Sequence, residues 1–152
     1  MPEKNTTTRR PKPISPIDNT YGHMPPQAIE IEKLVLGALM IDSDVFSVVS
    51  EILHPETFYE PRNQKIYEAI QSLNMNEKPV DIQTIIEELK RNGTLESVGG
   101  TIYVMELANG VASSAHAEYH AHIIAQKYTA RQLISYAGNI ETKAFDESID
   151  VD

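Results

Sequence analysis

Apolar residues recur at intervals of three and four along most of this chain, which is the period of an amphipathic α-helix. The first such stretch covers residues 27–40, the second follows residue 42, and the third follows Pro61. A fourth begins after Asp81, and a fifth spans residues 101–109. No stretch alternates convincingly as a strand would, so the pattern predicts an all-helical domain.

The core positions that this spacing predicts lie on four of these helices and in one loop. They are Ile31, Leu34, Val35, Ala38 and Leu39 in the first helix; Val45, Val48, Val49, Ile52 and Leu53 in the second; Ile66, Ala69, Ile70 and Leu73 in the third; and Ile82, Ile85, Ile86 and Leu89 in the fourth. Phe58 and Tyr59, in the loop before the third helix, are expected to be buried in the core.

Cap and turn residues predict where these helices begin and end. Asp42 or Ser43 can cap the second helix, and Asp81 can cap the fourth, because short polar side chains accept hydrogen bonds from free backbone N–H groups. Gly93 is placed to end the fourth helix. Gly99-Gly100 marks a turn into the fifth helix.

The last segment, residues 115–145, contains no proline and predicts one long helix. At ~1.5 Å per residue it would be roughly 45 Å long, which is longer than a small bundle requires. Its apolar residues form a heptad-like seam, typical of a helix that packs on another helix. The seam, which is the predicted protein-interaction site, consists of Tyr119, Ile123, Ala130, Leu133, Ala137 and Ile140. The alternative is that the first half of the helix completes the bundle and its end frays.

Composition divides the chain into parts. Residues 1–24 are rich in Thr, Pro and Asn, have no apolar period, and are expected to form a disordered tail. A globular helical head is expected over residues 25–112, followed by the long helix over 113–146. The pattern therefore predicts a small bundle of about five to six helices from which a long helix protrudes.

Charge argues against DNA as a partner of the body. The basic residues Lys4, Arg9, Arg10 and Lys12 lie in the tail, whereas the chain from Pro25 onward carries 9 basic and 20 acidic side chains. Affinity for nucleic acid comes largely from Lys and Arg, so this acidic body is a poor DNA-binding surface. No apolar run approaches the ~20 residues of a membrane span, and residues 1–10 lack a secretory signal. A cytoplasmic protein is the simplest interpretation.

Catalytic motifs are not found in the sequence. No glycine is followed by lysine, so a phosphate-binding P-loop is missing, and the chain has no cysteine for nucleophilic or thiolate chemistry. His116 and His120 have a spacing that can present two imidazoles to one metal, but with His122 pointing elsewhere a surface cluster is the favoured interpretation. No catalytic, cofactor-binding or metal-binding residue is therefore predicted.

Adjacent carboxylates diverge on a helix, which argues against an acid–base pair. A solvated face is the favoured interpretation of three such groups: Glu30 with Glu32, Glu87 with Glu88, and Asp146 with Glu147.

Several short motifs, in their order and spacing, resemble the N-terminal domain of the DnaB-type replicative helicases. They are Pro25-Pro26 with Glu30, Val35-Leu36-Gly37, Pro55-Glu56 with Phe58-Tyr59, Ile66-Tyr67, Pro79-Val80-Asp81, Gly93, Leu95, Gly99-Gly100 with Tyr103, Leu107, and Tyr119 with Ile123-Ile124. The resemblance runs from Pro25 to about Asp152. The chain departs from the family at Asn63, where histidine is common, and at residues 113–117, where the family often reads Pro-Ser-Ala-Ala-Asn.

The resemblance implies an orthogonal helical head followed by a helical hairpin, of which the long helix is the first arm. Residues 147–152 would then begin a linker or the second arm. Family members are hexameric rings that unwind DNA at the replication fork, and their N-terminal domains form a collar. The implied partners are other subunits, bacterial primase and, in some systems, a helicase loader. ATP, Mg²⁺ and most contacts to DNA would belong to a motor domain outside this fragment.

Other functions remain open from the residues alone. The seam would equally suit an independent acidic helical adaptor or a dimeric regulatory protein. A helix-turn-helix regulator is disfavoured by the acidic body, and no basic recognition helix is apparent. A small metal-dependent enzyme would depend on the histidine cluster.

Overall fold

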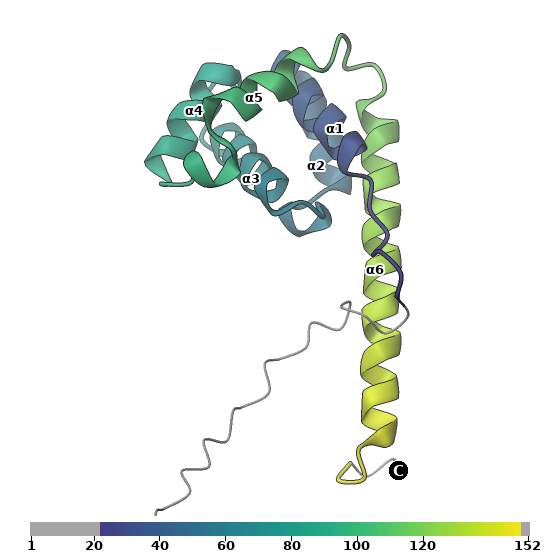
Figure 1. Cartoon of the computed structure of the whole chain (residues 1–152). Helices are drawn as coiled ribbons and strands as arrows, with labels where there is room; N and C mark the ends of the chain where they lie inside the picture. Colours follow the sequence, from purple (N-terminus) through teal and green to yellow (C-terminus); the bar gives the residue numbers. More distant parts are fainter. Residues whose placement is uncertain (1–21, 150–152) are drawn as a thin grey trace, which may run out of the picture. The chain divides into compact units, whose positions relative to one another are not determined.

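The computed structural model describes residues 22–149, and all of the regular secondary structure in that range is helical (Figure 1). The α-helices are α1 (Ile29–Ile41), α2 (Phe46–Ile52), α3 (Pro61–Met75), α4 (Ile82–Arg91), α5 (Gly100–Asn109) and α6 (Ala117–Phe145). Short 3-10 turns are η1 (Ser43–Val45), η2 (Pro55–Thr57) and η3 (Glu96–Val98). The all-helical prediction is confirmed. Most of the predicted tail, residues 1–21, lies outside the described residues.

The chain divides into two compact units. One unit covers residues 26–130 and contains α1 to α5 with the first half of α6. The other contains the second half of α6, from Arg131 onward, together with residues 22–25. Within residues 22–149, no helix is both long and apolar enough to cross a membrane.

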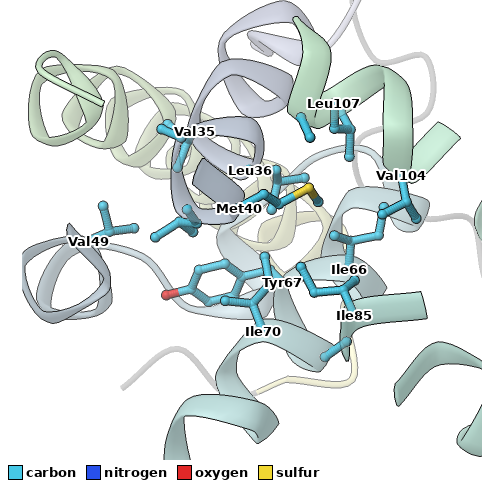
Figure 2. Close-up of a cluster of buried hydrophobic side chains, with 14 of the residues drawn as sticks. Val35, Leu36, Met40, Val49, Ile66, Tyr67, Ile70, Ile85, Val104 and Leu107 are labelled. Atoms are coloured by element: carbon cyan, nitrogen blue, oxygen red, sulfur yellow. The ribbon is translucent and has the colours of Figure 1, made fainter. Parts of the chain in front are cut away.

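The core of the first unit is built around α1. This helix packs against α3 and α5, and α4 packs against the same two helices. Figure 2 shows Leu36 and Met40 of α1 among side chains of α3, α4 and α5, including Ile66, Ile85 and Val104. Residues from four sequence-distant helices therefore share one apolar interior.

The predicted buried face of α1 is confirmed in part. Val35, Ala38 and Leu39 are buried as expected, whereas Ile31 and Leu34 are only half-buried. Residues 35–40 are buried without interruption, because α1 contacts helices on two sides. The spacing rule assumes a single buried stripe and therefore predicted a face that was too narrow.

The α2 prediction shows a shift in phase. Val49 and Leu53 are buried, but Val48 is 39% exposed, and Val45 and Ile52 are half-buried. Asp42 caps η1, whose 3-10 geometry differs from that of an α-helix, and α2 begins only afterwards. The shift buries Phe46, which the spacing did not select.

Helices α3 and α4 follow the prediction closely. All four expected residues of α3 are buried, as are Ile85, Ile86 and Leu89 of α4, while Ile82 is half-buried. Phe58 is fully buried and its ring lies 4.9 Å from that of Tyr67. Tyr59 was expected beside it in the core but is half-buried.

The ends of α4 confirm both predicted signals. The carboxylate of Asp81 accepts the backbone N–H of Thr84 at 2.9 Å, and the Thr84 hydroxyl accepts the N–H of Asp81 at 2.9 Å. At the other end Gly93 has a φ of +69°, and the N–H of Thr94 reaches back to the carbonyl of Leu89. These are a capping box and a left-handed helix stop.

Glycine at position 37 allows α1 and α5 to approach closely. A Cβ placed on Gly37 would lie 2.2 Å from the carbonyl oxygen of Leu107 and 2.6 Å from a methyl carbon of Val111. Any larger residue would force the two helices apart, so this glycine fixes the spacing of the helix pair.

Candidate association surface

The first half of α6 contributes one stripe of its surface to the core. Ala117, Ala121 and Ile124 are buried in the same apolar cluster as α1 to α5. Their spacing of four and three residues defines one helical face. The first half of α6 therefore completes the bundle, as one of the two sequence-based interpretations proposed.

The predicted seam lies away from that stripe. Tyr119 is two residues from both Ala117 and Ala121, a rotation of about 200° around the helix axis. Consistent with this, the side chain of Tyr119 is 68% exposed. Ile123, two residues after Ala121, is only half-buried. Completing the bundle thus leaves the seam uncovered.

The seam continues into the second half of α6. Leu133 is 64% exposed and Ile140 is 68% exposed, and Ala137 between them is also exposed. Ala130, at the end of the first unit, is half-buried. The six predicted residues thus follow one helix, and the larger ones present apolar surface to solvent.

Sequence spacing missed further apolar residues of the same region. Ile134, Tyr136 and Phe145 are all exposed, although they stand off the heptad-like register. The sequence indicates these residues through the high apolar content of residues 133–145, because they do not follow a single helical spacing. Exposed apolar residues that lie in a group, rather than singly, mark surfaces that bind a partner.

Glu32 contradicts the prediction of a solvated face. Its side chain is 1% exposed, and its carboxylate accepts the backbone N–H of Tyr59 at 2.6 Å and that of Glu60 at 3.3 Å. The side-chain amide of Asn63 also donates to it, at 2.9 Å. A carboxylate can be buried when several N–H groups replace its water, and here the loop before α3 and the first turn of α3 supply them.

The hydrogen-bond network continues from Asn63 to α5. The Tyr103 hydroxyl donates to Oδ1 of Asn63 at 2.6 Å, and the Arg62 guanidinium lies 3.8 Å from the centre of the Tyr103 ring. Burial raises the pKa of Tyr103 to about 12, so the hydroxyl keeps its proton and remains a donor. The network joins α1, α3 and α5, and Asn63, the departure from the family pattern, is its central member.

Glu88 is the second carboxylate that was wrongly placed on a solvated face. It is buried, and it accepts hydrogen bonds from the Ser72 hydroxyl at 2.9 Å and from Arg91. Burial raises its pKa, but these hydrogen bonds and the nearby charges of Arg91 and Lys78 outweigh burial and hold the pKa below its ordinary value. Glu87, Asp146 and Glu147 are exposed as predicted, and so is Glu30, which pairs with Lys33 at 2.7 Å.

His116 and His120 lie side by side in the structure, whereas His122 points to another side of the helix. The rings of His116 and His120 lie 6.3 Å apart, while Nε2 of His122 faces the carboxylate of Glu118 at 4.0 Å. Residues 22–149 contain no group of three or more His, Asp or Glu side chains arranged to hold one metal ion.

A small hollow lies between α1 and α5. Its volume is about 220 Å³, and its apolar wall includes Leu34, Leu107 and Val111. Pockets for drug-sized ligands and cofactors are typically ~300–1,000 Å³, so this hollow is small for such a ligand.

Comparison with known proteins identifies the family of the chain. A family model described as "DnaB-like helicase N terminal domain" matches residues 24–126. The chain belongs to this family. The match covers α1 to α5 and the start of α6, so the buried stripe and the beginning of the seam both lie within the DnaB-like domain.

Curated relatives extend the match along the chain. The chain is 43% identical over 149 residues to a replicative DNA helicase DnaB from Rhodothermus marinus, which covers 97% of this chain and 16% of that protein. It is 39% identical over 129 residues to the DnaB of Geobacillus stearothermophilus, covering 85% of this chain and 28% of the relative. The chain therefore spans less than a third of the length of these helicases.

Solved structures support the same fold. The N-terminal domain of DnaB helicase from Mycobacterium tuberculosis matches with a TM-score of 0.79 and 34% identity, covering 82% of this chain and 91% of that one. The corresponding domain from Helicobacter pylori, described together with its interactions with primase, matches with a TM-score of 0.66, covering 76% of this chain and 90% of that one. At 21% identity the second likeness concerns the fold alone.

Proposed function

We propose that this domain is part of the collar of a hexameric replicative DNA helicase, where it mediates subunit association rather than catalysis. The observation that carries the proposal is the seam of α6, of which Tyr119, Leu133, Ala137 and Ile140 remain exposed while the opposite face of the same helix contributes to the core. Membership of the DnaB family supports a role at the replication fork.

The energetics favour burial of the seam in an assembly. Covering one leucine or isoleucine side chain is worth roughly 1.5–3 kcal/mol. Leu133 and Ile140 are each more than half exposed, so most of that stabilisation is unrealised in the single chain. A neighbouring subunit that packs along Tyr119 to Ile140 would recover it.

Cysteine cross-linking tests this surface directly, and residues 1–152 contribute no cysteine of their own. Any cysteine elsewhere in the full-length protein is first replaced by serine. Leu133, Ala137 and Ile140 are replaced by cysteine one at a time in the full-length protein. Disulfide formation requires Cβ atoms within about 4.5 Å, so at least one seam position should give a covalent dimer under mild oxidation. The control is Thr101→Cys, at an exposed position on α5. Cross-linking no greater at any seam position than at residue 101 would refute the proposal.

The proposed partners are primase and, in some systems, a helicase loader. Support for primase comes from the Helicobacter pylori domain, which shares this fold and was described with its interactions with primase. Titration of the purified chain with primase from the same organism should give saturable binding. No binding by either the chain or the full-length protein would remove primase from the proposal.

Unwinding would depend on a motor domain that binds ATP and Mg²⁺ outside this chain. In this account residues 25–112 form the head, 113–146 form the first hairpin arm, and 147–152 begin a linker or the second arm. The isolated chain should show no DNA-stimulated ATPase activity. An ATPase that copurifies with it and is lost on a point mutation within these residues would contradict the assignment.

A further inference from the structure

Two histidines at the start of α6 lie side by side and have no role in the proposed function. His116 directly precedes the helix, and its carbonyl accepts the backbone N–H of His120 at 2.9 Å. The two residues are therefore one helical turn apart, and their ring centroids are separated by 6.3 Å. His116 is exposed and His120 is half-buried, so an ion from solvent can reach both.

We propose that His116 and His120 form a chelating pair for a divalent transition-metal ion such as Zn²⁺. Neutral imidazole binds Zn²⁺ at ~2.0–2.1 Å and is also a good ligand for Cu²⁺ and Ni²⁺. His116 lies one turn before His120 and the two ring centroids are 6.3 Å apart, so side-chain rotation can bring one nitrogen of each ring to a shared ion. Water completes the coordination, since residues 22–149 provide no group of three converging ligands.

The neighbouring side chains set the limits of the site. His122 is two residues from His120, a rotation of about 200° around the helix, and it faces Glu118 at 4.0 Å. It therefore stays outside the chelate. The ring of Tyr119 lies 6.2 Å from that of His120.

Metal binding would connect a residue before α6 to the end of the first turn of that helix. Because a preformed pair exists only in the folded chain, the ion would stabilise the folded state as its concentration rises above the dissociation constant. The start of α6, where the seam begins at Tyr119, would be the part held by the ion.

The test uses the complete 152-residue chain without an affinity tag, with ZnCl₂ as the probe in isothermal titration calorimetry. Wild type should bind one Zn²⁺ per chain saturably. His116→Gln and His120→Gln should each weaken binding at least about tenfold, while His122→Gln, the matched control, should leave it unchanged. MgCl₂ should not bind, because Mg²⁺ prefers oxygen ligands.

Two results would overturn the proposal. One is the lack of saturable Zn²⁺ binding by wild type, and the other is an equal loss of affinity in the His122→Gln variant. Circular dichroism checks the fold of each variant. If His120→Gln disturbs the packing of α6, His116→Gln decides the matter alone, because His116 is exposed and precedes the helix.

Discussion

Glu32 and Glu30 are two residues apart on α1, yet the structure gives them different roles. Glu32 is buried and accepts three N–H groups from the segment that begins α3. Glu30 is exposed and pairs with Lys33 at the surface. Replacing each in turn with alanine therefore compares a buried carboxylate with a solvated one on the same helix.

The expected losses differ several-fold. Glu32→Ala leaves the N–H groups of Tyr59, Glu60 and Asn63 without their acceptor, and because unsatisfied buried donors cost about 1–3 kcal/mol, the loss should reach about 3 kcal/mol. Glu32→Gln keeps one acceptor oxygen and should cost about 1–2 kcal/mol. Glu30→Ala removes one exposed ion pair and should cost no more than about 0.5 kcal/mol.

Urea denaturation of the three variants and the wild type, followed by circular dichroism, measures these differences. The free energy of unfolding should fall in the order Glu30→Ala, Glu32→Gln, Glu32→Ala, with the slope against urea unchanged. If Glu32→Ala is no less stable than Glu30→Ala, the buried network does not stabilise the head and the reasoning is refuted.

Three further predictions concern the backbone and a second buried carboxylate. Gly37→Val should destabilise the head by about 3 kcal/mol in urea, because its side chain would meet the Leu107 carbonyl, whereas Gly110→Ala, with its nearest contact at 3.2 Å, should cost much less; equal losses would contradict the tight α1–α5 contact. Glu77 has a φ of +54° and Gly93 a φ of +69°, so Glu77→Gly should raise stability by up to about 1 kcal/mol and Gly93→Ala should lower it by about 1–2 kcal/mol; changes of the opposite sign in thermal unfolding would count against this. Because the folded-state pKa of Glu88 is lowered, its contribution to stability is complete above the ordinary glutamate range and is lost as the pH falls through the lowered value. Glu88→Gln should therefore lose less stability than wild type on acidification, and parallel pH profiles would argue against this role.

The helices of the head could be predicted because local rules act on them almost alone. The spacing of Ile85, Ile86 and Leu89, the cap at Asp81 and the stop at Gly93 all favour the same helix, and the structure confirms each. The prediction was wrong at Val48, where the 3-10 turn at residues 43–45 changed the phase of the next helix.

The buried carboxylates could not be predicted because their partners are distant in the sequence. Glu32 receives hydrogen bonds from residues 27 to 31 positions away, and Asn63 in turn is bonded to Tyr103, 40 positions further on. Spacing along a helix assigns every glutamate to the solvent-facing side. The sequence offered one signal here, the asparagine at position 63 where the family often has histidine. That signal did not indicate a buried Glu32.

The seam of α6 could be predicted from the sequence only in part. Tyr119, Leu133 and Ile140 are exposed in the structure, whereas Ile123 and Ala130 are half-buried. The sequence could not separate this stripe from the core-facing one, Ala117, Ala121 and Ile124, because small residues give a weak periodic signal. That the seam associates with another subunit stays a prediction.

The molar mass of the full-length protein, measured by light scattering, shows whether the seam of α6 holds the subunits together. Leu133→Glu with Ile140→Glu would place charges that lose their water on association, at a cost that disfavours packing. Thr142→Glu with Lys143→Gln changes the net charge equally, at exposed positions outside the seam. We expect a mass well below that of the wild-type assembly for the first variant only, with an unchanged circular dichroism spectrum. A seam variant that assembles like wild type would contradict a subunit interface at the seam. One that unfolds the head would show that these residues belong to the core.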